Sequence, residues 1–348
     1  MNSRAGQAWW GKELADEPEA WRIAVPPEVA AELLAAARAA VAAGRRPDLD
    51  APRPTSLGAS EAFAAELGGR LAGGPGFVVA TGFPAAGLDP LEYEMAYWLL
   101  GLLLGRPVSQ SGKRDLLGRV EDRGADISSP VQRGYESSAG LPFHVDRTDV
   151  IGLLCVRPAA SGGLSRVASS RLVRDLLAAE WPDLLAELEQ PLPHDRRGEE
   201  QPGEQPWSGI PVFSETGGDF ATRYVRRFIT GSQRHPGAPR LTERQIEAMD
   251  ALDEILERPG LSLDMELREG DLQLLNNFHI LHARTAFADG GGRGRLLLRL
   301  WLAFADSPEL PEHYAALYGA TAGGSYRGGV WPAGGAPAQL GRPVAALG

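Results

Sequence analysis

The stretch LPFHVDRTDVIGLLCV, residues 141–156, places a histidine and an acid two positions apart in a largely apolar run. Because strand residues two apart project from the same face, His144 and Asp146 are expected to lie side by side. A second stretch, NNFHILHARTAF, contains His279 and His282, which a regular strand would turn to opposite faces. Two histidines and one carboxylate are the protein ligands of non-haem Fe(II) oxygenases, which leave metal positions open for a cosubstrate and dioxygen. The alternative is that His144 and Asp146 form a hydrogen-bonded pair in the core. The spacing alone does not decide between a metal site and a core pair, and it does not decide whether His279 or His282 is the second histidine.

Bulk composition limits the kind of partner. The 348 residues carry a formal net charge of -10, so the chain lacks a basic footprint for nucleic acid or for an anionic membrane surface. An apolar fraction of 43% supplies ample core, and a small molecule is the expected partner. The single cysteine, Cys155, excludes an intramolecular disulfide and fits a reducing compartment. We see no signal-peptide layout and no spanning helix, so we expect a cytoplasmic protein, and a homo-oligomer is left open.

The elements that must position these residues begin with helices. Helical spacing is typical of residues 27–43, where a proline stands near the start and Gly44 follows the end. It recurs at 61–72 and 90–104, on either side of a short apolar strand predicted at 76–83. The first third of the chain is therefore expected to be mainly helical.

The remainder of the chain is rich in strand patterns separated by glycine and proline. Predicted strands cover residues 147–156, 163–169, 210–214, 223–229, 261–267, 271–283 and 295–304. Two helices are predicted among them, at 171–189 with a break at Pro182 and at 242–258, and the polar stretch 194–206 is predicted as a solvated loop. Many strands with scattered turns favour a sandwich or a barrel.

Four motifs in order extend the pattern beyond one H-x-D. The sequence resembles the taurine dioxygenase (TauD/TfdA) family of Fe(II)/2-oxoglutarate-dependent dioxygenases, which has clavaminate synthase among its relatives, in FHVD, SGGLSRVASS, NNFHILHARTAF and RLLLRLWL. The resemblance covers roughly residues 76–305 and, more weakly, the RGG that begins at Arg327. It implies an α+β fold with a double-stranded β-helix (jelly-roll) core flanked by helices. We expect an N-terminal helical region at 1–75 packing on the core, a dioxygenase domain with helical insertions at 76–320, and a Gly/Ala/Pro-rich tail at 321–348.

The resemblance also implies the metal ligands. His144, Asp146 and His282 stand where the family has its iron ligands. His282 is preferred to His279 because it precedes A-R-T-A-F and has the family's distance from the arginines that follow. These three residues are therefore the predicted Fe(II) site and catalytic centre.

Other residues take cosubstrate and substrate roles by the same resemblance. Arg295 matches the arginine that binds the distal carboxylate of 2-oxoglutarate, which suits a planar guanidinium, and Ser165 matches a hydroxyl residue on that carboxylate. Arg299 lies roughly 13 Å further along a strand and is left for an anionic group of the substrate or for the iron-bound end of 2-oxoglutarate. Gln110 and Tyr135 fall in loops expected near the mouth of the barrel, so we predict that they contact substrate.

The implied activity is oxidation, by default hydroxylation, of a C–H bond in a small anionic or amino-acid-like molecule. Fe(II) is the cofactor, 2-oxoglutarate and O2 are consumed, and succinate and CO2 are released. The same iron chemistry could instead give desaturation or cyclisation in natural-product biosynthesis. A non-catalytic metal- or metabolite-binding β-barrel is the alternative from another class, and Ser165 and Arg295 beside a complete ligand set count against it. A zinc hydrolase is disfavoured because nothing marks a general base.

Overall fold

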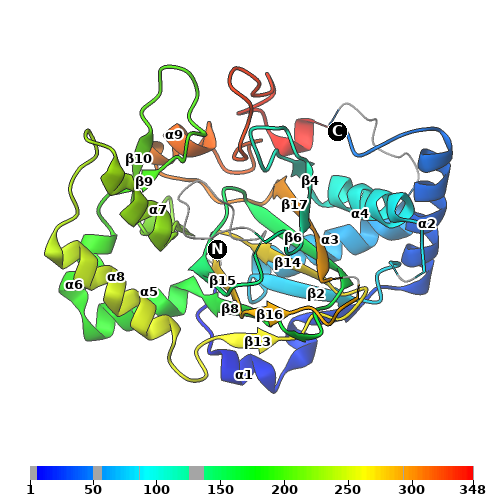
Figure 1. Ribbon diagram of the computed structural model, residues 1–348, viewed down its shortest axis with the longest axis horizontal. Helices are drawn as coiled ribbons and strands as arrows, with labels where there is room; N and C mark the ends of the chain where they lie inside the picture. Colours follow the sequence, from blue (N-terminus) through cyan, green and yellow to red (C-terminus); the bar gives the residue numbers. More distant parts are fainter. Residues whose placement is uncertain (1–5, 50–56, 86, 125–136, 293, 348) are drawn as a thin grey trace.

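Two β-sheets lie at the centre of the molecule, with helices on both outer sides (Figure 1). The computed structural model describes residues 6–49, 57–85, 87–124, 137–292 and 294–347. Neither sheet closes into a barrel in this described part of the chain.

The larger sheet is mixed. Its strands, in spatial order, are β1 (Arg22–Ala24), β2 (Phe77–Thr81), β14 (Leu272–Asn276), β6 (Val150–Arg157), β17 (Leu296–Ala303) and β3 (Arg106–Pro107), and β4 (Leu117–Val120) also pairs with β17. Only the β1–β2 pair is parallel among the described strands of this sheet, so the region expected to be helical also extends the sheet by one strand.

The smaller sheet carries both histidines of the predicted site. Its strands, in spatial order, are β13 (Leu263–Met265), β8 (Ser165–Ser169), β15 (Ile280–Arg284) and β5 (Leu141–His144). Short antiparallel pairs join β9 (Leu192–Asp195) with β10 (Trp207–Ile210), β11 (Phe213–Thr216) with β12 (Asp219–Thr222), and β7 (Ser161–Gly162) with β16 (Phe287–Ala288).

Helices cover the two sheets from opposite sides. The α-helices are α1 (Gly11–Ala15), α2 (Pro27–Ala42), α3 (Gly58–Gly73), α4 (Pro90–Leu104), α5 (Ser170–Glu180), α6 (Pro182–Leu188), α7 (Arg226–Gly231), α8 (Glu243–Leu256) and α9 (Ala315–Tyr318). Short 3-10 turns are η1 (Pro18–Ala20), η3 (Ser232–Arg234), η4 (Glu312–Tyr314) and η5 (Val344–Ala346). In Figure 1, α2, α3 and α4 lie at one end of the molecule, and α5, α6 and α8 lie at the other. None of the described helices combines the length and apolarity that a membrane crossing requires.

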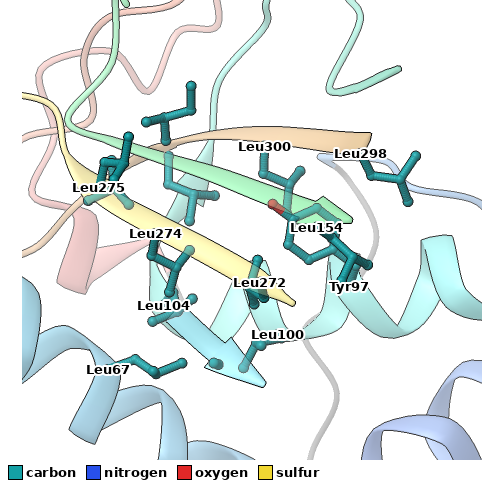
Figure 2. Close-up of a cluster of buried hydrophobic side chains, with 14 of the residues drawn as sticks. Leu67, Tyr97, Leu100, Leu104, Leu154, Leu272, Leu274, Leu275, Leu298 and Leu300 are labelled. Carbon is teal, nitrogen blue, oxygen red and sulfur yellow. The ribbon is translucent and has the colours of Figure 1, made fainter. Parts of the chain in front are cut away.

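The main core forms where α4 packs on the larger sheet (Figure 2). This helix is apolar nearly all round because α2 and α3 cover the face that the sheet leaves open. Close packing requires Gly101, since a Cβ there would lie 2.6 Å from Leu300 Cδ1. Leucines from three strands meet the helix at this contact: Leu154, Leu272, Leu274, Leu298 and Leu300.

A second core lies between the smaller sheet and α5, α6 and α8. The predicted break at Pro182 is confirmed, because α5 ends at Glu180 and Pro182 occupies the first turn of α6. Proline is tolerated there because an N–H in the first turn has no acceptor within the helix. The Thr242 hydroxyl accepts a hydrogen bond from Gln245 N and caps α8.

Three predictions of local structure were wrong. Residues 223–229 form the start of α7 after an extended segment, because the apolar alternation in RYVRRFI is too short to distinguish a strand from one helical face. Residues 271–283 form two strands, β14 and β15, in different sheets, with a turn between them. The stretch 194–206 is a loop as predicted only from Arg196 onward, because its first two residues belong to β9, where His194 is buried rather than solvated.

Candidate active site

The three predicted metal ligands meet where β5 pairs with β15. His144 and His282 are direct antiparallel partners, and their ring centroids lie 4.3 Å apart. Asp146 follows the end of β5 by two residues, so the backbone beyond the strand, and not strand alternation as predicted, brings its carboxylate to the histidines. Ligand atoms of the three residues all lie within 4.8 Å of one another. His144 Nδ1 lies 2.8 Å from the Pro142 carbonyl oxygen, which leaves Nε2 as the ring nitrogen that could coordinate a metal.

His279 lies outside this group. It precedes β15, and its ring stacks near Phe220 with a centroid separation of 6.4 Å. Burial lowers the pKa of His279 to about 4, so it is a neutral core histidine.

The backbone at Asp146 is held by two side chains from distant segments. Asp146 N donates to Asn277 Oδ1 at 3.0 Å, and Asn277 Nδ2 donates to the carbonyl oxygens of Asp146 at 2.5 Å and Thr148 at 2.9 Å. Arg223 Nη1 donates to the carbonyl oxygens of Val145 at 2.9 Å and Asp146 at 3.0 Å. The carboxylate therefore projects from a rigid segment, as a metal ligand requires.

Electrostatics favour the protonation states that a metal needs. Burial acts to raise the pKa of Asp146, but the charges of Arg299, His144 and His282 and a hydrogen bond from Trp301 outweigh it, so the pKa is lowered. The Trp301 Nε1 to Asp146 Oδ2 distance is 3.1 Å, and Arg299 Nη1 lies 3.7 Å from the same oxygen. Burial, reinforced by His144, lowers the pKa of His282 to about 3. A carboxylate and a neutral imidazole are the forms that coordinate Fe(II).

A small cavity on one side of this group contains buried arginine groups. Ser165, Arg284 and Arg295 line it together with the ligand residues and Arg299. Arg295 Nη1 and Arg284 Nε and Nη1 are buried without a hydrogen-bond partner among the described residues. Burial, together with the charge of Arg295, lowers the pKa of Arg284 to about 10. The Ser165 hydroxyl donates to Gln273 Oε1 at 2.9 Å. Unfilled donors of this kind fit a carboxylate ligand.

A larger cavity of about 600 Å³ lies on the other side and meets the first at His144, Asp146 and Arg299. Its walls come from β5 and the following loop, from β9 and the loop after it, and from α7, which is why no single stretch of sequence reveals it. Among the described residues, its lining contains seven arginines against four carboxylates. The arginines are Arg147, Arg196, Arg197, Arg223, Arg226, Arg227 and Arg299.

Of the predicted substrate contacts, Arg299 lies on the cavity walls and Gln110 lies behind it. Arg299 lines both cavities, stacks over Trp301 at 4.9 Å and donates from Nε to Gln110 Oε1 at 2.6 Å. Gln110 is buried and lines neither cavity, and its Nε2 also donates to the Arg299 carbonyl oxygen at 2.8 Å. It therefore orients Arg299 instead of lying at the cavity mouth as expected. Tyr135 lies outside the described residues.

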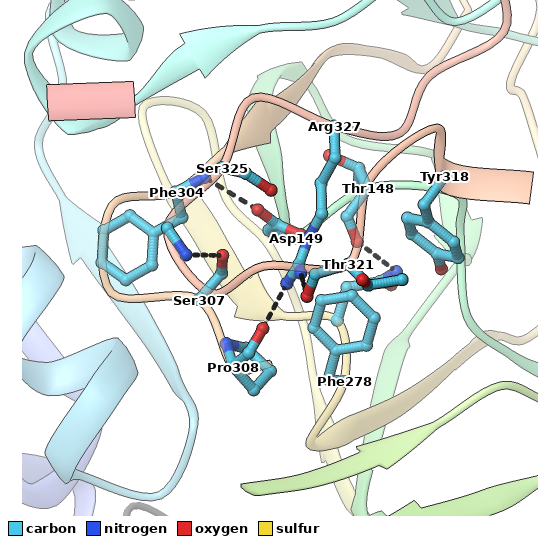
Figure 3. A network of polar contacts seen from close by, with 12 residues as sticks. Thr148, Asp149, Phe278, Phe304, Ser307, Pro308, Tyr318, Thr321, Ser325 and Arg327 are labelled. Carbon is cyan, nitrogen blue, oxygen red and sulfur yellow. Dashed lines mark hydrogen bonds and ion pairs between the residues drawn. The ribbon is translucent and has the colours of Figure 1, made fainter. Parts of the chain in front are cut away.

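A buried ion pair between Arg327 and Asp149 anchors the C-terminal segment to the chain just after Asp146 (Figure 3). Arg327 Nε lies 2.9 Å from Asp149 Oδ1, both side chains are fully buried, and Phe304 N donates to Asp149 Oδ2 at 3.0 Å. Gly329 N then donates to the Arg147 carbonyl oxygen at 2.8 Å. Gly329 has a φ of 74°, and a Cβ there would lie 2.8 Å from the Ser109 carbonyl oxygen. Both observations explain why position 329 is glycine.

Sequence reasoning missed several residues of this site. Asn277 and Arg223 hold the Asp146 backbone, Trp301 contacts its carboxylate, and Arg147 and His194 line the larger cavity. Arg147 directly follows the H-x-D spacing, and this adjacency was the one available signal. Trp301 shares the strand parity of Arg299, which alone could not separate a site residue from core.

Fold and site together define a metal-dependent oxygenase with paired sheets. The model of the family described as "Taurine catabolism dioxygenase TauD, TfdA family" matches residues 34–301, and this chain belongs to that family. It is an Fe(II)/2-oxoglutarate-dependent dioxygenase that oxidises a small molecule, so the predicted enzyme class and cofactors are confirmed.

Two curated relatives cover most of the chain. FR-33289 synthase of Streptomyces rubellomurinus (strain ATCC 31215) is 31% identical over 316 residues, which are 88% of this chain and 92% of the relative. Taurine hydroxylase-like protein SAT17 of Stachybotrys chartarum (strain CBS 109288 / IBT 7711) is 30% identical over 312 residues, 84% of this chain and 77% of the relative.

Solved structures share the fold at lower identity. Asparagine oxygenase, in complex with Fe(II), 2S,3S-3-hydroxyasparagine and succinate, is 20% identical with a TM-score of 0.62 and covers 83% of this chain and 97% of its own. The non-heme iron oxygenase OrfP, in complex with Fe and alpha-ketoglutaric acid, is 18% identical with a TM-score of 0.60. This match covers 81% of this chain and 93% of the OrfP chain. These similarities confirm the predicted α+β jelly-roll fold.

Proposed function

We propose that this enzyme hydroxylates an unactivated C–H bond of a small, anionic, amino-acid-like molecule. The observation that carries the proposal is the position of His144, Asp146 and His282 between two cavities, a small one with unfilled arginine donors and a larger one. This arrangement supports cosubstrate binding on one side of the metal and substrate binding on the other.

In this proposal the three residues hold Fe(II), and the small cavity holds 2-oxoglutarate. Arg295 binds the distal carboxylate, with Ser165 beside it. When bound, Fe(II) with 2-oxoglutarate and O2 supplies the oxidising power for C–H attack, and succinate and CO2 are released. Asn277 keeps the Asp146 carboxylate oriented, and burial keeps the His282 imidazole neutral.

The larger cavity is the proposed substrate site. Arg299 lies at the junction of the two cavities, where it can hold a substrate anion or the metal-proximal end of 2-oxoglutarate, and Gln110 fixes its guanidinium. The neighbours support an amino-acid-like substrate, because asparagine oxygenase was solved with hydroxyasparagine and OrfP with (3S)-hydroxy-L-Arg. FR-33289 synthase supports a role in natural-product biosynthesis, where desaturation or cyclisation is the alternative outcome.

A cytoplasmic location also belongs to this proposal. Cys155 is a free, buried thiol, and burial raises its pKa to about 12, so it is an inert core residue that suits a reducing compartment.

Succinate formation tests the proposed function. Protein reconstituted anaerobically with Fe(II) is given 2-oxoglutarate, O2 and a panel of amino acids and small anionic molecules. Wild type and His313→Ala, a histidine outside both cavities, should form succinate. His144→Ala and Arg295→Gln should lose at least about 90% of this activity because each removes a proposed binding group.

Product mass then identifies the reaction. Gain of one oxygen atom indicates hydroxylation, and loss of two hydrogens indicates desaturation or cyclisation. Binding of Fe(II) and 2-oxoglutarate without succinate from any compound in the panel would favour the non-catalytic binding protein.

A further inference from the structure

The two oxygens of the Asp146 carboxylate have different surroundings. Trp301 Nε1 donates a hydrogen bond to Oδ2 at 3.1 Å, and Arg299 Nη1 lies 3.7 Å from the same oxygen. Oδ1 accepts no hydrogen bond from any residue in the described part of the chain. The protein therefore engages one oxygen of this carboxylate and leaves the other without a donor.

Trp301 is held in a position that suits this contact. It lies on β17 two residues after Arg299, so both side chains project from the same face of the strand. The Trp301 side chain is 5% exposed, and the Arg299 guanidinium carbon lies 4.9 Å from the centre of its ring. Gln110 Oε1 accepts a hydrogen bond from Arg299 Nε at 2.6 Å, which holds the stacked guanidinium in place. Because an indole N–H can only donate, Trp301 requires an acceptor such as Oδ2 at this position.

The number of Asp146 oxygens that bind a metal decides how many metal positions stay open. Two histidines and one carboxylate oxygen leave three of six positions, enough for a chelating 2-oxoglutarate and for dioxygen. A carboxylate can also bind a metal through both of its oxygens. Binding of that kind would leave two positions, and 2-oxoglutarate alone would fill them.

Charge separates the two oxygens in the same sense as the hydrogen bond. Arg299 is a cation, so a metal dication close to Oδ2 would lie beside a second positive charge. Oδ1 is the end of the carboxylate that neither Trp301 nor Arg299 contacts. Both neighbours therefore favour Oδ1 as the oxygen that binds the metal.

We propose that Trp301 is a positioning residue that keeps Oδ2 of Asp146 from the metal, so that Asp146 binds through Oδ1 alone. The inference rests on the proposed function, because it takes His144, Asp146 and His282 as the iron ligands. It goes beyond that function by giving Trp301 the task of keeping the third metal position open for dioxygen.

Nitric oxide, used as a substitute for dioxygen, tests this role. Its binding to protein loaded anaerobically with Fe(II) and saturating 2-oxoglutarate is followed by electron paramagnetic resonance. Trp301→Phe keeps an aromatic ring but lacks the N–H. It should bind nitric oxide at least about tenfold more weakly than wild type, since loss of a hydrogen bond to a charged group frees Oδ2 for the metal.

Metal affinity separates this role from a merely structural one. The Co(II) affinity of Trp301→Phe should fall less than about tenfold, because a second metal–oxygen bond replaces the lost hydrogen bond, whereas lost support alone typically costs about 10-fold to 100-fold. Trp331→Phe is the matched control. Trp331 is 6% exposed, donates from Nε1 to the Gly328 carbonyl oxygen at 3.0 Å and forms no hydrogen bond to Asp146 within the described structure. It should leave both affinities unchanged.

Two further measurements keep the test independent of how well a variant folds. Thermal unfolding of each variant establishes that it is folded. A crystal structure of wild type loaded anaerobically with Fe(II) and 2-oxoglutarate requires no variant, and it should show Asp146 bound through Oδ1 with the Trp301 bond to Oδ2 intact. Oδ2 bound to the metal in that structure would overturn the proposal.

The failure of this inference differs from failure of the proposed function. If folded Trp301→Phe binds nitric oxide within about tenfold of wild type, or if its Co(II) affinity falls about tenfold or more, Trp301 does not keep a metal position open and the proposed function stands. If His144→Ala binds Co(II) as tightly as wild type does, the proposed ligand set is wrong, and the inference about Trp301 fails with it.

Discussion

Asn277 lines neither of the two cavities described above, yet its side chain fixes the backbone of a proposed metal ligand. Its amide forms three hydrogen bonds, to the N–H and carbonyl of Asp146 and to the carbonyl of Thr148. Asn277→Ala removes all three. At about 1 kcal/mol each, the free energy of unfolding should fall by about 3 kcal/mol. Because the orientation of a ligand is lost as well, metal affinity should fall about 10-fold to 100-fold.

Asn276→Ala is the control for this prediction. Asn276 has the same side chain, is also buried, and binds Phe278 N at 3.2 Å and the Leu71 carbonyl at 3.4 Å, with no contact to Asp146. Urea unfolding measures stability, and anaerobic titration with Co(II), a spectroscopic substitute for Fe(II), measures metal affinity. Both variants should be destabilised, but only Asn277→Ala should bind metal more weakly. Equal metal affinity in the two variants would refute the reasoning that the Asp146 backbone needs this support.

The three candidate metal ligands could be predicted from the sequence, because local spacing and the order of the motifs identify them. His144 and His282 are direct partners where β5 pairs with β15, and the backbone just beyond β5 brings Asp146 to them. The sequence shows the H-x-D spacing and the motif that contains His282 without reference to the fold. Helices α2, α3 and α4 were predicted to within a few residues, because proline, glycine and 3.6-residue spacing mark their ends locally, whereas the short α1 was not predicted.

The substrate side could not be predicted in the same way. Arg147, Arg196 and Arg223 come from three segments, and only tertiary packing brings them to one cavity. In sequence, RYVRRFI alternates like a strand, and the polar run that begins at His194 resembles a solvated loop. The first pattern gave the wrong local structure, and the second missed the buried strand residues His194 and Asp195, because burial against distant elements outweighed local preference. Gln110 shows the same limit, since its role depends on a partner 189 residues away.

Two further predictions concern stability. Arg327→Met should lower the free energy of unfolding by about 3–5 kcal/mol, because it leaves the Asp149 carboxylate buried without its partner. Adding Asp149→Asn should restore part of this loss in urea unfolding, and a double variant no more stable than the single one would contradict the argument. The second prediction concerns His279, whose pKa burial lowers from 6.5 to about 4. Above pH 6.5 it is neutral whether folded or unfolded, so no stability is lost there. Between 6.5 and about 4 the unfolded chain takes up a proton that the folded protein does not, so stability falls as pH falls. Lowering the pH from about 7.5 to about 5.5 should therefore cost wild type about 1 kcal/mol more than His279→Gln. Urea unfolding at both pH values measures this difference, and an identical pH dependence in the two proteins would show that His279 is protonated in the folded state.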